Sequence, residues 1–334
     1  MKKLRPINKF ISVLFISIAA SLVSCTDETC QFEGDVSDIQ MGVSVNRLER
    51  GLEEIKDSLS AEQYLQQYPN YKKFLSPIAF PKAFVLFAAD KRFAAVRKEI
   101  SNAFNDTILA SLTTELRSLF TNINYYYPEF RGYEVNTVFT GYGFDYELTN
   151  NTIYIDLAYF LNEKPQIENF PSYISRHYTM NNIVPKIAHE CAKRLQAYDP
   201  SDRTLLNSMI AFGRDYYFMS KVMPCISDTI LLEYTSEEFT LLQKHRKEIW
   251  NYYVKEQLFY DESPEIATRF LNPTPFTNVI ADKCPGRTAQ WLGYEIVKSY
   301  MEKNKDVTIV ELMSNRDSKE IFAASGYRKV IGAN

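Results

Sequence analysis

Beyond its first two dozen residues, the sequence lacks any apolar run long enough to cross a bilayer, which takes about 20 residues. The first 24 residues differ from the rest. Four cations (Lys2, Lys3, Arg5 and Lys9) precede an apolar run, Phe10 to Val23, that is interrupted only by serines. This run is itself short for a membrane span, and the charged-then-apolar layout is typical of a secretory signal. We therefore predict that residues 1–24 are removed on export.

An excess of positive charge is also missing. Without residues 1–24 the chain has 34 Lys and Arg against 41 Asp and Glu, a formal net charge of −7. Nucleic acid is excluded as the expected partner, because phosphate binding relies on a basic face. The remaining length of about 310 residues suits one large domain or two modest ones. With no internal repeat or low-complexity linker, a single domain over residues 41–334 is the simplest prediction.

Cysteines are few and carry no metal-binding spacing. The chain has five, and no two of them form a CxxC pair. Four lie in the exported part, where two disulfides or single buried thiols both agree with the pattern, and the pairing cannot be read from the sequence. These four are Cys30, Cys191, Cys225 and Cys284.

The fifth cysteine closes the signal segment. Leu22-Val23-Ser24-Cys25 resembles a lipobox, at which the signal is cut before the cysteine and the sulfur and new amine are acylated. Several acyl chains hold a protein on a bilayer, since each buried CH₂ contributes about 0.8 kcal/mol. We predict lipidation at Cys25 and a polar tether over residues 25–40. The alternative is an ordinary secreted protein with a chance cysteine, and the sequence leaves the membrane face open.

Hydrophobic periodicity predicts a predominantly helical α+β fold with one small sheet. Val135, Val138, Ile153 and Ile155 are strand formers, and nearby glycines and asparagines supply turns, which indicates a hairpin or small sheet over residues 134–159. Apolar residues at helical spacing predict helices elsewhere. The predicted helical segments are 43–59, 81–122 with a break near Asn105-Asp106, a helix from 181 with the stripe Ile183, Ile187, Cys191 and Leu195, and 203–221, 236–257, 286–304 and 317–324.

One pentapeptide invites a chemical interpretation. His189-Glu190-Cys191-Ala192-Lys193 resembles the zinc-peptidase signature HExxH, in which two imidazoles one turn apart bind zinc and the glutamate polarises the bound water. Lys193 replaces the second imidazole, and an ammonium has no lone pair for a metal. The pattern is open to three interpretations: a divergent zinc site, an inactive relic with His189 and Glu190 left over, or a solvated helix face. No cofactor is predicted.

Other reactive residues give weaker signals. His177 and His245 are the only further imidazoles, and surface or capping roles are the commoner outcome for such residues. Cys191 has no imidazole beside it in the sequence, so a structural thiol is the expected role. Trp250, Trp291 and the tyrosine clusters are expected to pack in or near the core.

Several stretches together resemble the GldB family of gliding-motility-associated lipoproteins of the Bacteroidetes. The likeness covers most of the exported chain and is most specific from 285 to 327. The matching stretches are Tyr68-Pro69, Tyr125-Tyr126-Tyr127-Pro128, Ile210 to Phe218, Pro224, Ile249-Trp250, Pro275-Phe276-Thr277, Pro285-Gly286-Arg287, Trp291-Leu292-Gly293, Ile296 to Tyr300, and Ser325-Gly326-Tyr327.

That resemblance implies a function and a fold. The family is similar to predicted gluzincin-type zinc peptidases, in which a glutamate on a later helix completes the metal site. Phe212 occupies that position here, and Asp215 would supply a ligand only if the helix register shifts. His189 and Asp215 are therefore the remaining metal-ligand candidates in a pseudo-peptidase fold. The resemblance implies a lipid-anchored envelope protein, expected at the outer membrane, that works in gliding and type IX secretion.

Three functional hypotheses remain open at this point. The first is a non-catalytic scaffold or assembly factor, anchored to the bilayer through Cys25 and bound to envelope proteins. The second is a divergent metallopeptidase built on His189, Glu190 and Asp215. The third is a surface lipoprotein that binds a glycan or another ligand through its aromatic residues, which make up 14% of the chain.

Overall fold

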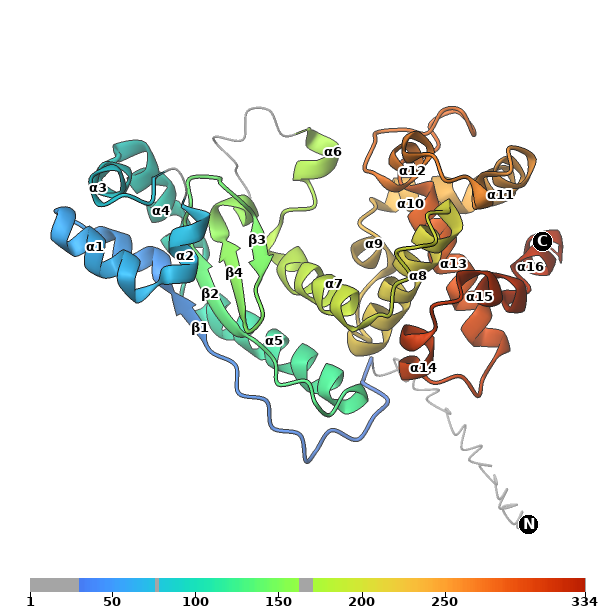
Figure 1. Ribbon diagram of the computed structural model, residues 1–334, viewed down its shortest axis with the longest axis horizontal. Helices are drawn as coiled ribbons and strands as arrows, with labels where there is room; N and C mark the ends of the chain where they lie inside the picture. The colour runs from blue at the N-terminus through green and yellow to red at the C-terminus, as the bar shows by residue number, and fades with distance from the viewer. Residues whose placement is uncertain (1–29, 76–77, 162–170, 334) are drawn as a thin grey trace, which may run out of the picture. The chain divides into compact units, whose positions relative to one another are not determined.

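The computed structural model describes residues 30–75, 78–161 and 171–333 (Figure 1). The predicted signal, residues 1–24, and the lipidation site Cys25 lie outside the described residues. By its internal contacts the chain divides into residues 1–31 and residues 32–334. No helix among the described residues has both the length and the apolar character of a membrane span.

A four-stranded mixed sheet lies in the N-terminal half of the second unit. The strand order is β1-β2-β4-β3, with β2 parallel to both β1 and β4, and β3 antiparallel to β4. Every residue of β4 is buried, so both faces of the sheet are covered. The sheet predicted over 134–159 is confirmed. The bounds are β1 Val45–Arg47, β2 Glu134–Val138, β3 Tyr146–Leu148 and β4 Thr152–Asp156.

Residues 43–59, expected as one helix, fold differently. They form β1, a 3-10 helix η1 (Leu48–Glu54) and only the start of α1 (Ser58–Gln67). The predicted long helix over 81–122 is three helices. It breaks at Asp90, whose side chain caps α4, and at Asn105, whose side chain caps α5 near the break that the sequence indicated. The three helices are α3 Pro81–Ala89, α4 Lys91–Ala103 and α5 Asp106–Tyr126, and the short helix α2 (Pro69–Phe74) precedes them.

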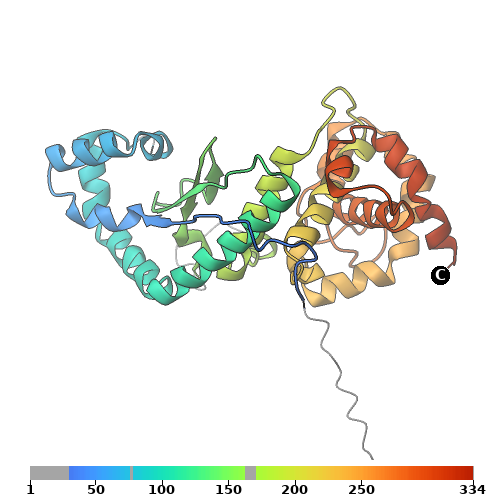
Figure 2. The same ribbon diagram turned by 90° about the horizontal axis from the view of Figure 1, so that it is seen from below.

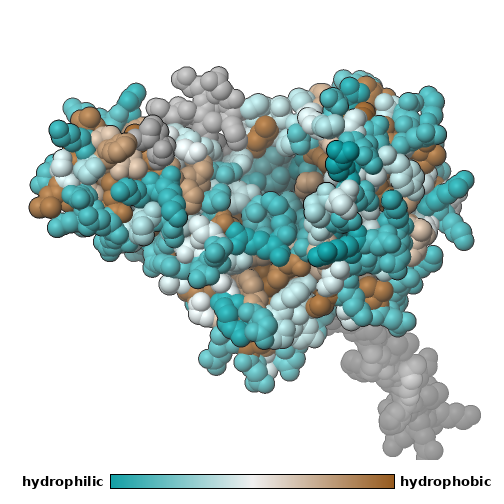
Figure 3. Space-filling model, in the orientation of Figure 1, coloured by the Kyte–Doolittle hydropathy of each residue, from teal (hydrophilic) through white to brown (hydrophobic). Residues whose placement is uncertain are grey.

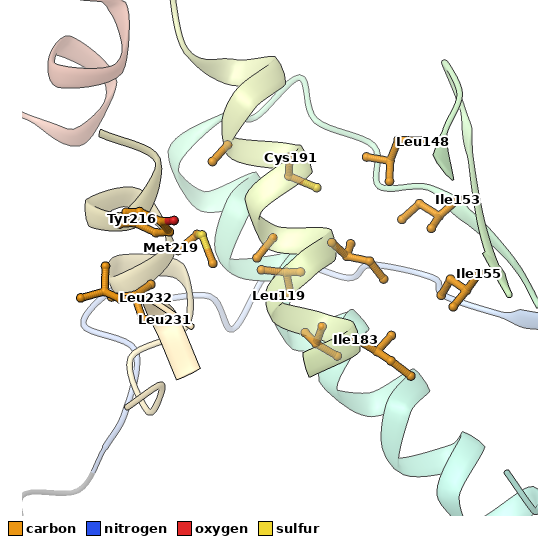
Figure 4. Close-up of a cluster of buried hydrophobic side chains, with 14 of the residues drawn as sticks. Leu119, Leu148, Ile153, Ile155, Ile183, Cys191, Tyr216, Met219, Leu231 and Leu232 are labelled. Carbon is orange, nitrogen blue, oxygen red and sulfur yellow. The ribbon is translucent and has the colours of Figure 1, made fainter. Parts of the chain in front are cut away.

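Helix α7 (Ile183–Leu195) links the sheet to the C-terminal helices. Figure 4 shows Ile183 and Cys191 on α7 pointing toward Ile153, Ile155 and Leu148 of the sheet. The opposite side of α7 packs against α8 (Leu205–Val222). In Figure 2, α5 extends from α4 to the neighbourhood of these two helices, and it packs against both. The predicted apolar stripe of α7 is therefore the face that covers the sheet.

Two glycines let α8 and α13 (Thr288–Lys303) pack backbone against backbone. A Cβ at Gly213 would lie 2.3 Å from the Gly293 carbonyl oxygen, and a Cβ at Gly293 would lie 2.0 Å from the Met209 carbonyl oxygen. No side chain larger than hydrogen fits between such surfaces. This contact fixes α8, which carries candidate site residues, against the central helix of the C-terminal half.

Most of the later elements, α9, η4, α12 and α14 to α16, pack against α8 or α13. The helices predicted over 203–221, 286–304 and 317–324 are confirmed as α8, α13 and α15. The helix predicted over 236–257 is two helices that meet at His245. The other bounds are η2 Leu157–Phe160, α6 Ser172–Ser175, η3 Met180–Asn182, α9 Asp228–Leu231, α10 Ser236–Lys244, α11 Arg246–Lys255, η4 Leu258–Tyr260, α12 Pro264–Leu271, α14 Ile309–Ser314, α15 Ser318–Ser325 and α16 Tyr327–Ala333.

Candidate functional site

The packing of α7 against α8 brings His189 and Asp215 together. The Nε2 atom of His189 lies 3.5 Å from Oδ2 of Asp215. The His189 ring stacks on Tyr216 at a centroid distance of 5.4 Å, and the Phe212 ring lies 6.0 Å away. The α8 register therefore places both Phe212 and Asp215 against His189. The sequence had offered these two as alternatives.

Asp215 is held in a buried polar network. Only 2% of the residue is exposed, and the Gln196 amide donates a hydrogen bond of 2.5 Å to Oδ1. Arg214 donates to the Gln196 side-chain oxygen at 2.9 Å and also to the Asn315 carbonyl. Burial raises the pKa of the Asp215 carboxyl, and the nearby His189 offsets only part of that rise. Among the described residues, the buried Nε2 of His189 makes no hydrogen bond.

The other two positions of the HExxH-like segment pair with each other. Lys193 Nζ lies 2.7 Å from Glu190 Oε1, one turn along α7, and both side chains are partly exposed. The lysine therefore neutralises the glutamate that would polarise a metal-bound water in a peptidase. Cys191, between them, is a free thiol buried against the sheet, and burial raises its pKa to about 12.

The donor set does not fit a catalytic zinc ion. With bonds of about 2.0–2.2 Å and tetrahedral angles, zinc holds its donor atoms about 3.4 Å apart, and His189 and Asp215 meet that spacing. A catalytic zinc, however, takes three protein ligands. The Lys193 ammonium and the Phe212 ring offer no lone pair. In the described part of the chain, no three His, Cys, Asp or Glu side chains are grouped to hold a metal ion.

The remaining histidines lie in other surroundings. His177 accepts a hydrogen bond of 3.1 Å from Arg176, and burial lowers its pKa to about 4. His245 stands at the junction of α10 and α11 with its Nδ1 buried. Cys284 is a buried free thiol, whereas Cys30 and Cys225 are disulfide-bonded.

A second charged group, which sequence reasoning missed, lies on the same helix. Lys186, one turn before His189, places its Nζ 2.6 Å from Glu233 Oε1, and Arg287 places a guanidinium nitrogen 3.2 Å from Glu233 Oε2. We call these three residues the ion cluster. Burial raises the pKa of Glu233, but the two cations outweigh it and bring the pKa to about 2.

The backbone of the ion cluster is strained. Glu233 and Arg287 both have positive φ, 52° and 56°, which non-glycine residues seldom adopt. Arg287 also donates a hydrogen bond to the Glu233 carbonyl, and its guanidinium lies 4.6 Å from the centroid of the Tyr234 ring. Such strain persists only where surrounding contacts over-determine it. The Pro285-Gly286-Arg287 stretch was the available signal, but its partners Lys186 and Glu233 lie far away in the sequence.

Tyr216 connects the two groups. Its ring stacks on His189, and its buried hydroxyl donates to the Gln290 side-chain oxygen at 2.5 Å on α13. Arg287 and Glu233 are close enough to affect the pKa of Tyr216, which burial raises. The polar residues of α7 therefore form one connected region with α8, α13 and the segment before α10.

Two cavities of the described chain differ in their relation to this region. A small one of about 190 Å³ lies between α6, α9 and the start of α10, and its lining includes Arg176, His177 and Tyr234. Figure 3 shows a hollow over this part of the molecule. A larger cavity of about 1070 Å³ lies between α11, η4, α15 and α16 around Trp250 and Phe259. The larger one contains none of the site residues described above, whereas the lining of the small one includes Tyr234, whose ring contacts Arg287 of the ion cluster.

Comparisons with known proteins give one match. A family model described as gliding motility protein GldB matches residues 29–329. No curated protein and no solved structure matches the chain. The family match spans every residue of the site described here.

Proposed function

The chain belongs to the family of gliding motility protein GldB, and from this premise we propose that it is a lipid-anchored, non-catalytic envelope protein. In this proposal it acts as a scaffold or assembly factor for the gliding machinery and the linked type IX secretion. Acyl chains on Cys25 hold it at the outer membrane, and its partners are other envelope proteins.

The observation that carries the proposal is the pairing of the lysines and of Glu190 on the HExxH-like helix with opposite charges. Lys193 neutralises Glu190, Lys186 neutralises Glu233, and His189 faces the buried Asp215. In a peptidase of the HExxH type, the glutamate acts as general base and must be free to take a proton from the metal-bound water. Charges that are paired across elements instead hold those elements in place, as a binding surface requires.

Metal analysis tests the non-catalytic part. Protein purified from membranes is dialysed against zinc and then against buffer, and the bound metal is measured by mass spectrometry. We expect well below one zinc per chain, because two donors bind weakly. One zinc per chain, lost in His189→Ala, would overturn the proposal.

The anchor is tested separately. The intact mass of the protein purified from membranes should exceed that of the chain from Cys25 by the mass of its acyl groups. A Cys25→Ser variant should leave the membrane fraction and lose function. An unmodified Cys25 in the membrane-derived protein would refute the anchor and leave the metal argument standing.

A divergent metallopeptidase is the second candidate, because the His189–Asp215 spacing matches two zinc ligands. It predicts peptide cleavage that a chelator abolishes. Incubation with a peptide library, with and without chelator, decides between the two. A chelator-sensitive product that is missing in His189→Ala would favour the enzyme.

A further inference from the structure

Helix α3 exposes large apolar side chains at the surface of the protein. Its sequence carries one charge, Lys82, among apolar residues. Phe84 and Phe87 are buried, whereas Phe80, directly before the helix, is 71% exposed and Leu86 is 73% exposed. Lys82 and Leu86 are four residues apart and so share the outward face. Figure 3 shows hydrophobic surface gathered over α3.

The surroundings of this face are basic although the exported chain is acidic. Residues 58–103, from α1 through α4, hold seven Lys and Arg against three Asp and Glu. The net charge of the whole chain therefore hides a local excess of cations. Five of these cations are exposed on α2, α3 and the start of α4: Lys72, Lys73, Lys82, Lys91 and Arg92. Arg92 is paired with Asp90 at 2.7 Å, so we call Phe80, Leu86 and the four lysines the α3 patch.

We propose that the α3 patch docks on a bilayer surface that carries anionic head groups. Phe80 and Leu86 enter the boundary between head groups and acyl chains, and the cations lie at the phosphate level. The charge argues against a second copy of the chain as occupant, because two α3 patches would bring like charges together. An apolar face with a basic rim matches an anionic lipid surface instead.

This inference rests on the proposed lipid anchor. Cys30 is disulfide-bonded and the Phe32 ring packs on Tyr125 and Tyr126, so the lipidated Cys25 is joined to the folded chain through only a few residues, which span less than about 20 Å, and the anchor keeps the domain close to the bilayer. An anchored protein needs only a modest further attraction to hold one face down, since the anchor raises its local concentration at the membrane. The α3 patch would thereby set the orientation of the domain on the membrane.

A reporter on the patch tests the proposal. Ala89 is exposed at the end of α3, and Ala89→Cys leaves Phe80 and Leu86 in place. Cys191 and Cys284 are buried and Cys30 and Cys225 are disulfide-bonded, so the new thiol takes an environment-sensitive dye. The protein purified from membranes is reconstituted in vesicles of phosphatidylglycerol and phosphatidylcholine, or of phosphatidylcholine alone. Val279→Cys, at a 52% exposed site outside the patch, is the control.

We expect a blue shift and quenching by lipid-borne quenchers at position 89 with phosphatidylglycerol, reduced by high salt, and neither effect at position 279. Replacing Lys72, Lys73 and Lys82 by Gln should lower the docked-to-free ratio by about a hundredfold, since each lysine near an anionic surface is worth about fivefold. The same charge change at the exposed Lys244, Lys247 and Lys255 should not.

Three outcomes would overturn the inference. The first is no change in dye emission at position 89 in protein that floats with the vesicles, and the second is an equal change at position 279. The third is a change that depends on protein concentration without vesicles, which would indicate contact with a second copy. If the protein did not float with phosphatidylcholine vesicles and its mass showed no acyl groups, the lipid anchor would be refuted but the α3 patch would not. The response of such protein to phosphatidylglycerol would still decide whether the α3 patch binds lipid.

Discussion

Replacing Gly293 by alanine sets two opposed effects against each other. Gly293 lies inside α13, where alanine favours an exposed helix by about 1 kcal/mol over glycine. In this protein the new Cβ would lie 2.0 Å from the Met209 carbonyl oxygen on α8. Ordinary contact needs about 3.4 Å or more, so the two helices must separate by more than 1 Å along their closest line. The obstacle is backbone, which cannot rotate away as a side chain does.

We expect the packing effect to win. Overpacking of a tight core costs about 1–3 kcal/mol and sometimes more, and here it acts at the contact that joins the two central helices. A 2.0 Å approach to backbone belongs at the upper end of that range, so after the gain of about 1 kcal/mol in helix propensity Gly293→Ala should lower the free energy of unfolding by about 2 kcal/mol. Urea denaturation followed by circular dichroism measures this as a lower midpoint at unchanged slope.

A matched glycine provides the control. Gly332 lies in α16, and a Cβ there would meet nothing within 4 Å. Gly332→Ala should therefore be neutral or raise the stability by up to about 1 kcal/mol. If Gly293→Ala were as stable as the original protein, or more stable, the close approach of α8 and α13 would be wrong, and the placement of Asp215 would fall with it.

Three further predictions concern charged positions. Lys193→His adds a third donor beside His189 and Asp215, so we expect zinc binding to rise from undetectable toward one ion per chain in a calorimetric titration. Unchanged binding would mean that α7 does not direct the side chain at position 193 toward His189 and Asp215. The pKa of Glu233 is lowered to about 2, so its contribution to the free energy of unfolding is fully present above its unfolded pKa near 4.3 and is lost as the pH falls toward 2. Glu233→Gln should flatten the fall in stability across that window. An unchanged acid profile would contradict the ion cluster. Burial raises the pKa of Asp156 to about 7, so the folded state holds this proton to a higher pH than the unfolded state does. The free energy of unfolding should therefore fall as the pH rises from about 4 to 7. Asp156→Asn should remove that slope in urea denaturation at pH 5 and pH 7, even if it lowers stability at both.

Local patterns predicted the type of most elements, but not their interruptions. The β-branched residues of β2 and β4 and the apolar stripe of α7 marked a sheet and a helix correctly. The segment around Val45 was misread, because its apolar residues also occur at helical spacing. Its strand exists because Val45 pairs with Val135 on β2, some ninety residues away. Such a partner cannot be inferred from a local period.

Only part of the candidate site could be predicted from the sequence. His189, Glu190 and Lys193 lie within one helical turn or so, and their type alone indicated a broken metal motif. The approach of Asp215 to His189 depends on how α8 packs on α7, and a one-residue change of helix register moves a side chain by 100° around the axis. The ion cluster draws Lys186, Glu233 and Arg287 from three separate segments, so only the fold brings them together.

The charges on the polar face of α7 join it to other parts of the fold. Each contact from this face reaches a different partner: Lys186 reaches Glu233 before α10, and His189 reaches Asp215 on α8. Removing one partner of a fully buried pair costs about 3–5 kcal/mol, and the cost for Lys186 should be smaller because Glu233 keeps partial contact with solvent. Substitutions on this face should therefore act first on stability and on the surface that α7, α8 and α13 present together. An enzyme would lose rate before it lost fold, so a loss of function in Lys186→Met that tracks the loss of folded protein would support the scaffold, whereas full stability with no function would argue for chemistry at the site.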